Sequence, residues 1–291
     1  MRWPEPGDFK RLLRIGALWV WICLPQAAAA QAAEFRGLWV DTFNAGLRSS
    51  SEVGRLVADA RAGHFNALLV EVRRRGDAYY ESLFEPKAAN VWPPDYDPLA
   101  DLILQAHDTR AGPRLEVHAW IVTYNIWNHE STLPPQANHP YRLHPDWVTR
   151  SATGLSWDGS NYAFDPGHPE VQQHTFNVAL DLVSRYDLDG LHLDYIRYAG
   201  NTWGYHPVSL DRFRALYGRT GTPSATDAQW LQFRRDQVTD LVRKIYLSTL
   251  ARKPHIKISA ATITWAPGIT TAAEWPNSAA FQSVLQDWRG W

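Results

Sequence analysis

The 291-residue sequence has little cysteine, little excess charge and no long apolar run, and each absence excludes a class of protein. Its single cysteine, Cys23, rules out an internal disulfide framework and a thiolate metal cluster. The 29 Lys and Arg residues against 30 Asp and Glu leave a net charge of −1, without the basic excess of a dedicated nucleic-acid-binding protein. The sequence also lacks a G-x-S-x-G elbow and the dinucleotide and phosphate-loop signatures. Hydrophobic residues still make up 45% of the chain, enough for a substantial core.

The N-terminal segment has the pattern of a bacterial secretory signal peptide. Basic residues precede an apolar run at 15–24, and small residues then lead to an A-x-A site at Ala30 and Ala32. An apolar helix of this length is too short to cross a bilayer about 30 Å thick. We therefore predict a cleaved signal peptide at 1–32 and a secreted or periplasmic mature chain, 33–291, without a membrane span.

After the signal, predicted strands alternate with predicted helices. The strands are 35–41, 65–73, 115–124, 190–198 and 255–265, and the helices are 52–61, 97–107, 168–186 and 226–253. Nearly continuous apolar strands separated by helices are typical of a parallel sheet in an α/β fold. We predict one domain, a (β/α)8 TIM-like barrel truncated after about five βα units. An open sheet is the alternative, because a closed barrel needs eight strands.

Polar side chains occupy alternate positions on three of these strands, and the positions between them are apolar. Since side chains alternate along a strand, one parity is expected to face the barrel axis. The inward set is Glu71 and Arg73, His118 and Trp120, and His192 and Asp194. These groups form either an ion-pair layer that fills the core or a functional cluster toward the carboxyl ends of the strands.

Asp194 is the strongest catalytic candidate. We expect it to emerge at the top of the barrel, flanked by Tyr195 and Arg197. A carboxylate kept ionised by a nearby cation suits the nucleophile or base of glycoside hydrolysis. The second carboxyl has to stay protonated through burial or a like charge, and Glu71 is the best inward candidate. Asp41 and Asp165 compete with it. Retaining and inverting mechanisms both stay open, because the separation of the carboxyl groups decides between them.

Tryptophan is the most over-represented residue, with 15 in the chain. Indole rings stack on the C–H faces of pyranose sugars and offer an N–H to a hydroxyl group, so the aromatic residues favour a glycan as the partner. We predict Arg73, His118 and His192 as orienting groups. The residues predicted to contact sugar are Trp120, Tyr124, Trp127, Tyr195 and Arg197.

Five segments in order resemble the glycosyl-hydrolase-like family ten of exported bacterial proteins. They are 35–41, 70–73 followed by 76–80, 96–99, 118–120 and 189–198. The resemblance covers residues from about 34 to the end. It implies a TIM-like barrel that hydrolyses glycans, with peptidoglycan strands as the substrate. The chain departs from the family pattern at Glu71, where the family often has Gln, and at Tyr195, where it often has Asp.

Two other functions fit the same residues. A glycan-binding protein with an incomplete barrel would share the aromatic loops. A metal-dependent polysaccharide deacetylase would use His118, His192 and Asp194 as ligands, although no H-E-x-x-H motif is present. Our prediction is a glycoside hydrolase without a cofactor or a bound metal.

Overall fold

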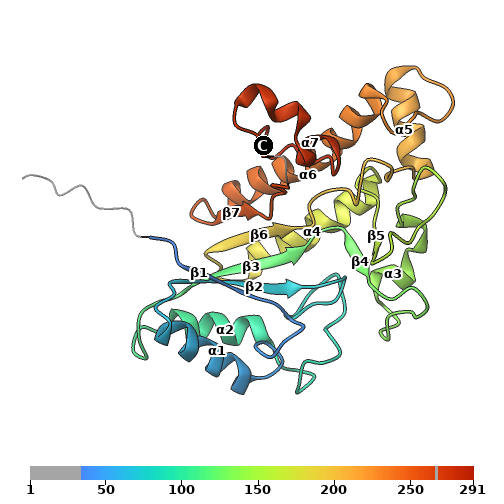
Figure 1. The fold of residues 1–291 in the computed structure, drawn as a ribbon. Coiled ribbons are helices and arrows are strands. Elements are labelled where there is room, and N and C mark those ends of the chain that lie inside the picture. Colours follow the sequence, from blue (N-terminus) through green and yellow to red (C-terminus); the bar gives the residue numbers. More distant parts are fainter. Residues whose placement is uncertain (1–33, 266–267) are drawn as a thin grey trace, which may run out of the picture. The chain divides into compact units, whose positions relative to one another are not determined.

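A parallel sheet of five strands forms the centre of the computed structural model, which describes residues 34–265 and 268–291 (Figure 1). In spatial order the strands are β1 (Gly37–Val40), β2 (Ala67–Arg73), β3 (Glu116–Val122), β6 (Gly190–Asp194) and β7 (Lys257–Ala260). Within this sheet, the spatial order of the strands is the same as their order along the chain, as in a TIM barrel. The predicted signal peptide at 1–32 lies outside the described residues.

Helices connect these strands, and a two-stranded antiparallel sheet follows β3. The helices are α1 (Ser50–Ala62), α2 (Pro98–His107), α3 (Pro140–Leu143), α4 (Pro169–Arg185), α5 (Pro207–Tyr217), α6 (Ala228–Arg252) and α7 (Ala279–Gln282). Short 3₁₀ helices cover Pro145–Trp147 and Ala272–Asn277, and the small sheet pairs β4 (Asn125–Trp127) with β5 (Tyr162–Ala163). Among the described helices, none combines the length and the hydropathy needed to span a membrane.

The helices begin where the sequence supplies a cap. The side chains of Asp97 and Asp227 accept hydrogen bonds from the backbone of the first turns of α2 and α6. His168 and His206 do the same for α4 and α5, and each is followed by a proline in the first turn. Proline is suited to that position because its missing N–H would have no partner in the helix.

The two faces of the central sheet differ in polarity. One parity of β2, β3 and β6 is wholly apolar, fully buried and part of the main core, where it packs with residues of α1, α2, α4 and α6. That parity consists of Leu68, Val70, Val72, Val117, Ala119, Ile121, Leu191 and Leu193. The covering helices therefore lie on a single face, as in the outer layer of a barrel. The polar parity is left for the opposite face.

That opposite face is concave. The ring of Trp39, on β1, lies 4.8 Å from the ring of His192, on β6, although β2 and β3 separate the two strands. In a flat sheet the two backbones would lie about 14 Å apart, three strand spacings. The sheet must therefore curve around this face, with the curvature of a barrel wall.

The prediction of a TIM-like α/β fold with about five βα units is confirmed. The sheet of the described residues is open, with β1 and β7 at its two edges, and residues 35–291 form one compact unit. The fourth predicted strand ends at Asp194 rather than at residue 198, because Tyr195 has a φ of +48° and leaves the extended conformation. The fifth is shorter than predicted, and the sequence pattern did not reveal α5 or the pair β4 and β5.

Candidate active site

The concave face brings together most of the polar strand residues that the sequence singled out. Glu71, Trp120 and His192 pair in register across β2, β3 and β6, so they lie at one level. Asp194 lies two residues farther along β6, level with Val122. These positions are at the carboxyl ends of the strands, where TIM-type enzymes have their active sites.

A pocket of about 150 Å³ opens at these strand ends. It is lined by Phe43, Glu71, Arg74, Arg75, Trp120, Val122, Asn125, Asn161, Asp194 and Tyr195. Two carboxyl groups, two guanidinium groups and three aromatic rings thus share one small cavity. We take it as the candidate site because it joins concave shape with convergent ionisable groups.

Glu71 is almost completely buried, with 2% of its surface exposed. Its Oε2 accepts hydrogen bonds from the backbone N–H of Thr42 at 2.9 Å and from the Thr42 hydroxyl at 2.5 Å. Burial raises the pKa of the Glu71 carboxyl above its usual value, although the Thr42 bonds and the charges of Arg74 and Arg75 act against this. Among the described residues no donor reaches Oε1, which leaves that oxygen able to carry a proton.

Asp194 is held by N–H donors on both of its oxygens. The indole N–H of Trp120 donates to Oδ2 at 3.1 Å, and the backbone N–H of Tyr195 donates to Oδ1 at 2.7 Å. Burial also raises the pKa of Asp194, against the effect of these two bonds and of the Arg197 charge. An N–H group can only donate, so both bonds favour the ionised carboxylate.

Arg73 and Tyr124 do not face the pocket. A register shift between Glu71 and Arg73 turns the Arg73 side chain out of the concave face, where it forms a two-bond ion pair with buried Glu85 at 2.7 Å. Arg73 also donates to the carbonyl groups of Val122 and Thr123. Tyr124 is 1% exposed and belongs to the main core. The structure therefore does not bring these two predicted site residues to the pocket.

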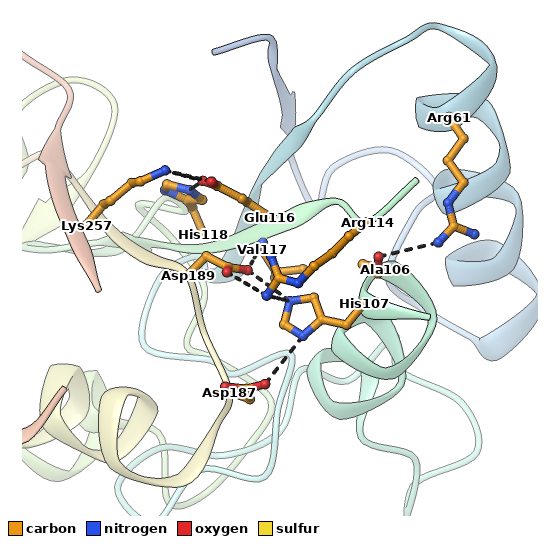
Figure 2. A network of polar contacts seen from close by, with 10 residues as sticks. All are labelled: Arg61, Ala106, His107, Arg114, Glu116, Val117, His118, Asp187, Asp189 and Lys257. Carbon is orange, nitrogen blue, oxygen red and sulfur yellow. Dashed lines mark hydrogen bonds and ion pairs between the residues drawn. The ribbon is translucent and has the colours of Figure 1, made fainter. Parts of the chain in front are cut away.

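His118 lies on the concave face but at the opposite end of the strands. It pairs in register with Gly190, the first residue of β6, and its Nε2 is 2.9 Å from Glu116, which also binds Lys257 (Figure 2). This position is remote from the carboxyl ends of the strands, so the structure does not bring His118 to the pocket. Figure 2 also shows Asp189 bonded to His107, Arg114 and the backbone of Val117 in the same network.

His192 forms a cluster of three neighbouring rings with Trp39 and Trp120. Its Nδ1 is 2.8 Å from the hydroxyl of Ser259, and its buried Nε2 has no partner among the described residues. Burial lowers the pKa of His192 to about 4, with a smaller contribution from His118. His192 is therefore neutral at physiological pH and supports the Trp120 ring rather than supplying a charge.

Three further predicted residues lie in the segments that follow β3 and β6. Tyr195 lines it and is partly exposed. The guanidinium of Arg197 lies over the ring of Tyr195 at 4.8 Å and near that of Trp265 at 5.7 Å. Trp127, on β4, packs against His129 and His139 and donates its indole N–H to the backbone of Thr132. Tyr195 and Arg197 thus adjoin Asp194, and Trp127 is not among the residues that line the pocket.

The two competing carboxylates have structural partners. Asp41 accepts bonds from the backbone of Phe43 and Asn44 and shapes the loop after β1. Asp165 is fully buried and accepts bonds from the hydroxyls of Thr149 and Ser209. Neither lines the pocket, which leaves Glu71 and Asp194 as its two carboxyl groups.

Sequence reasoning missed several residues of the pocket. Phe43, Asn125 and Asn161 carried no pattern that marked them, and neither did Thr42, which binds Glu71. Arg74 and Arg75 had a visible signal, since three arginines in a row close a buried strand just before Gly76. Such a run places positive charge at the carboxyl end of the strand, next to the inward Glu71.

A metal centre finds no support in the described part of the chain. His118 and Asp194 lie at opposite ends of the strands, so the set of His118, His192 and Asp194 does not converge. Residues 34–265 and 268–291 hold no group of three or more His, Cys, Asp or Glu side chains placed to bind a metal ion. The deacetylase hypothesis is therefore not supported.

A curved parallel sheet, helices on its outer face and two carboxyl groups at the strand ends together define the barrel wall of a TIM-type glycoside hydrolase fold. The chain belongs to the Glycosyl hydrolase-like 10 family, whose family model matches residues 34–291.

Two curated relatives share most of this chain. Glycosyl hydrolase YngK of Bacillus subtilis is 28% identical over 275 residues, which cover 89% of this chain and 49% of the relative. Glycosyl hydrolase DigH of Escherichia coli K12 is 25% identical over 312 residues, which cover 92% of this chain and 64% of the relative. The chain thus spans about half to two thirds of the length of these relatives.

Two solved structures have a similar fold. The α-L-fucosidase isoenzyme 2 from Paenibacillus thiaminolyticus has a TM-score of 0.61 and 18% identity, over 79% of this chain and 33% of that chain. The glycoside hydrolase domain of PgaB (BpsB) from Bordetella bronchiseptica has a TM-score of 0.59 and 14% identity, over 86% of this chain and 69% of that chain. At these identities the likeness concerns the fold.

Proposed function

We propose that this protein hydrolyses glycosidic bonds in a glycan of the bacterial cell envelope, with peptidoglycan strands as the substrate. The observation that carries the proposal is the pair of carboxyl groups, buried Glu71 and partly buried Asp194, that line one pocket at the carboxyl ends of the strands. Glycoside hydrolysis needs such a pair, one to protonate the leaving oxygen and one to act on the anomeric carbon or on a water. The family membership supports the reaction class.

The hydrogen bonds of the two carboxyl groups suggest how the roles divide. Asp194 receives N–H donors on both oxygens, an arrangement suited to the ionised nucleophile or base. Glu71 receives both of its bonds on Oε2, so Oε1 can hold the proton that a general acid delivers. A pKa raised by burial keeps such an acid protonated nearer to neutral pH.

The aromatic residues around Asp194 give the pocket its affinity for sugar in this proposal. Trp120 orients Asp194 through its indole N–H and presents its ring to the pocket. Tyr195 and Arg197 provide a further stacked surface on the other side of Asp194. Trp127, farther out on β4, would contact a longer glycan. His192 packs beside the Trp120 ring on the neighbouring strand.

An envelope location follows from the N-terminal segment, whose basic, apolar and small-residue regions are typical of a signal peptide. We therefore place the mature protein in the periplasm or outside the cell. A protein in either location can contact peptidoglycan.

Glycan binding without cleavage is the second candidate function. The half-exposed Trp39 ring favours it, since it extends the aromatic surface of the open concave face beyond the carboxyl pair. A binding protein needs the aromatic surface but neither carboxyl group.

Release of reducing ends from purified peptidoglycan strands distinguishes the two functions. We expect release by the wild type, a loss of at least about a thousandfold in Asp194→Asn, and unchanged release in Asp240→Asn, a control on the exposed surface of α6. Retention of the strands by the wild type in a pull-down, with no reducing ends released, would instead establish the binding function.

A further inference from the structure

Arg75 is a half-buried cation that lines the pocket. Its guanidinium forms no hydrogen bond and no ion pair with any residue of 34–265 or 268–291. The guanidinium lies over the face of the Phe43 ring, whose centroid is 4.8 Å away. Removing a guanidinium from water costs free energy unless an anion or an acceptor takes its N–H groups. The position therefore calls for a ligand.

The backbone of Arg75 is held in place by hydrogen bonds and by the turn that follows it. Its N–H donates to Asp77 Oδ1 at 3.2 Å, and its carbonyl group accepts from His139 Nε2 at 2.8 Å. Gly76 follows with a φ of +75°, and a Cβ at that position would lie 2.6 Å from Ile126 Cδ1. This tight, packed turn holds Arg75 at the edge of the pocket.

The neighbouring Arg74 differs from Arg75 because it has an ion-pair partner. It also lines the pocket, but its guanidinium is bound to Asp77 at 2.9 Å and so its charge is neutralised within the protein. Arg75 has no equivalent carboxylate.

The charge balance of the site leaves room for an anion. When Glu71 carries the proton of a general acid, Asp194 is the one remaining negative charge among the residues that line the pocket and are not already paired. The half-buried Arg197 acts on the charge of Asp194, whereas Arg75 acts on Glu71, which is then neutral, and on Asp77, which Arg74 already binds. One positive charge is therefore in excess.

We infer that Arg75 is a specificity-determining residue whose guanidinium binds a carboxylate carried by the glycan. The ring of Phe43 covers the face of the guanidinium, which leaves its in-plane N–H groups free for the two-bond geometry that carboxylates prefer. The substrate is then an acidic glycan, with a uronic acid or an ether-linked lactic acid on a sugar near the cleaved bond. This inference rests on the proposed function of the same pocket.

A pair of oligosaccharides that differ in one charge tests the inference. The probes are a tetrasaccharide containing muramic acid with its carboxyl group free and the same tetrasaccharide with that group converted to a methyl amide. For Arg75→Gln we expect kcat/KM on the acid to fall about 10- to 100-fold, the loss of a charged two-bond contact, and to change less than about threefold on the amide. Arg75→Lys keeps the positive charge but cannot form the two-bond contact, so its kcat/KM on the acid should lie between those of the wild type and Arg75→Gln.

The control is Arg110→Gln, which removes a highly exposed arginine at the end of α2 and should behave as the wild type on both probes. Thermal unfolding of every variant reports whether the fold is intact. Equal losses of Arg75→Gln and Arg75→Lys on acid and amide would overturn the inference, since they indicate a structural role. A wild type that does not distinguish acid from amide would overturn it as well.

Binding measured by calorimetry separates this inference from the proposed function. With Asp194→Asn as the background, we expect the acid to bind more tightly than the amide, and the added Arg75→Gln to abolish the difference. If the wild type cleaves neither probe but shows this preference, hydrolysis fails and the role of Arg75 stands. If the wild type cleaves both equally, hydrolysis stands and the role of Arg75 fails. No binding and no cleavage of either probe would overturn both.

Discussion

Replacement of Trp120 by phenylalanine tests how the site controls the charge of Asp194. The substitution keeps an aromatic ring between Glu71 and His192 but removes the indole N–H that donates to Asp194 Oδ2 at 3.1 Å. A hydrogen bond to a charged group contributes about 1.5 to 3 kcal/mol, and the length of this one favours the lower end. A loss of about 1.5 kcal/mol corresponds to roughly one pKa unit.

The direction of the change follows from the chemistry of the bond. The N–H group stabilises the ionised carboxylate, so its removal raises the pKa of Asp194 further above the usual value. If Asp194 acts as the ionised nucleophile or base, the low-pH limb of kcat/KM moves up by about one pH unit in Trp120→Phe. On that limb the activity falls about tenfold, whereas on the plateau the change is small.

The assay is the pH profile of kcat/KM on a peptidoglycan oligosaccharide, measured for the wild type and for Trp120→Phe. Trp39→Phe is a matched control, because the Trp39 ring packs against Trp120 and has no hydrogen bond to Asp194 among the described residues. Its low-pH limb should stay in place. A low-pH limb unmoved by Trp120→Phe, or a shift of the high-pH limb instead, would refute the assignment of Asp194 as the group that acts ionised.

Three further predictions concern stability. Glu71→Gln should raise Tm at pH 7, and the gain should disappear below about pH 4, because a native pKa above the unfolded value of 4.5 makes the wild type lose stability as pH rises through that range. A thermal scan of both proteins from pH 3 to 8 checks this. The pKa of His192 is lowered from 6.5 to about 4, so the wild type should lose up to about 3 kcal/mol of its free energy of unfolding as pH falls through this range. His192→Gln should not show this loss, which differential calorimetry measures. Glu85→Gln should cost about 3 to 5 kcal/mol in urea unfolding, since it leaves Arg73 buried and unpaired, and a loss below 1 kcal/mol would contradict the importance of that pair.

The fold was predictable because its signals are local and repetitive. Apolar positions at helical spacing mark α1, and apolar positions with a period of two mark β2, β3 and β6. The same period assigned Glu71, Trp120, His192 and Asp194 to one face. The alternation of side chains along a strand predicts which face each one occupies. This was enough to assign Glu71 and Asp194 to the same face.

The rest of the site depends on facts that alternation does not carry. It does not tell how far along a strand a residue lies relative to the neighbouring strands, which is why His118 was assigned to the wrong end. It also fails across a bulge, and the register shift after Glu71 moved Arg73 from the concave face to Glu85. Thr42, which binds Glu71, comes from the loop after β1 and is brought there only by the tertiary fold.

The length of each strand was a third source of error. Strand β6 was predicted to continue to residue 198, but the left-handed backbone of Tyr195 ends it at Asp194. This change of direction matters for the site, because it lets the Tyr195 N–H turn back to Asp194 Oδ1 and places the Tyr195 ring at the pocket. Propensity alone does not predict a positive φ at a tyrosine.

Titration of the carboxyl carbons by ¹³C NMR tests the central claim most directly. In protein labelled at Asp and Glu, the signals missing from Glu71→Gln and from Asp194→Asn identify the two groups. We predict midpoints above the ordinary values of 4.5 and 3.8, respectively, and a shift of both signals when a peptidoglycan oligosaccharide is added. Ordinary midpoints, together with signals that the oligosaccharide leaves unmoved, would contradict the account.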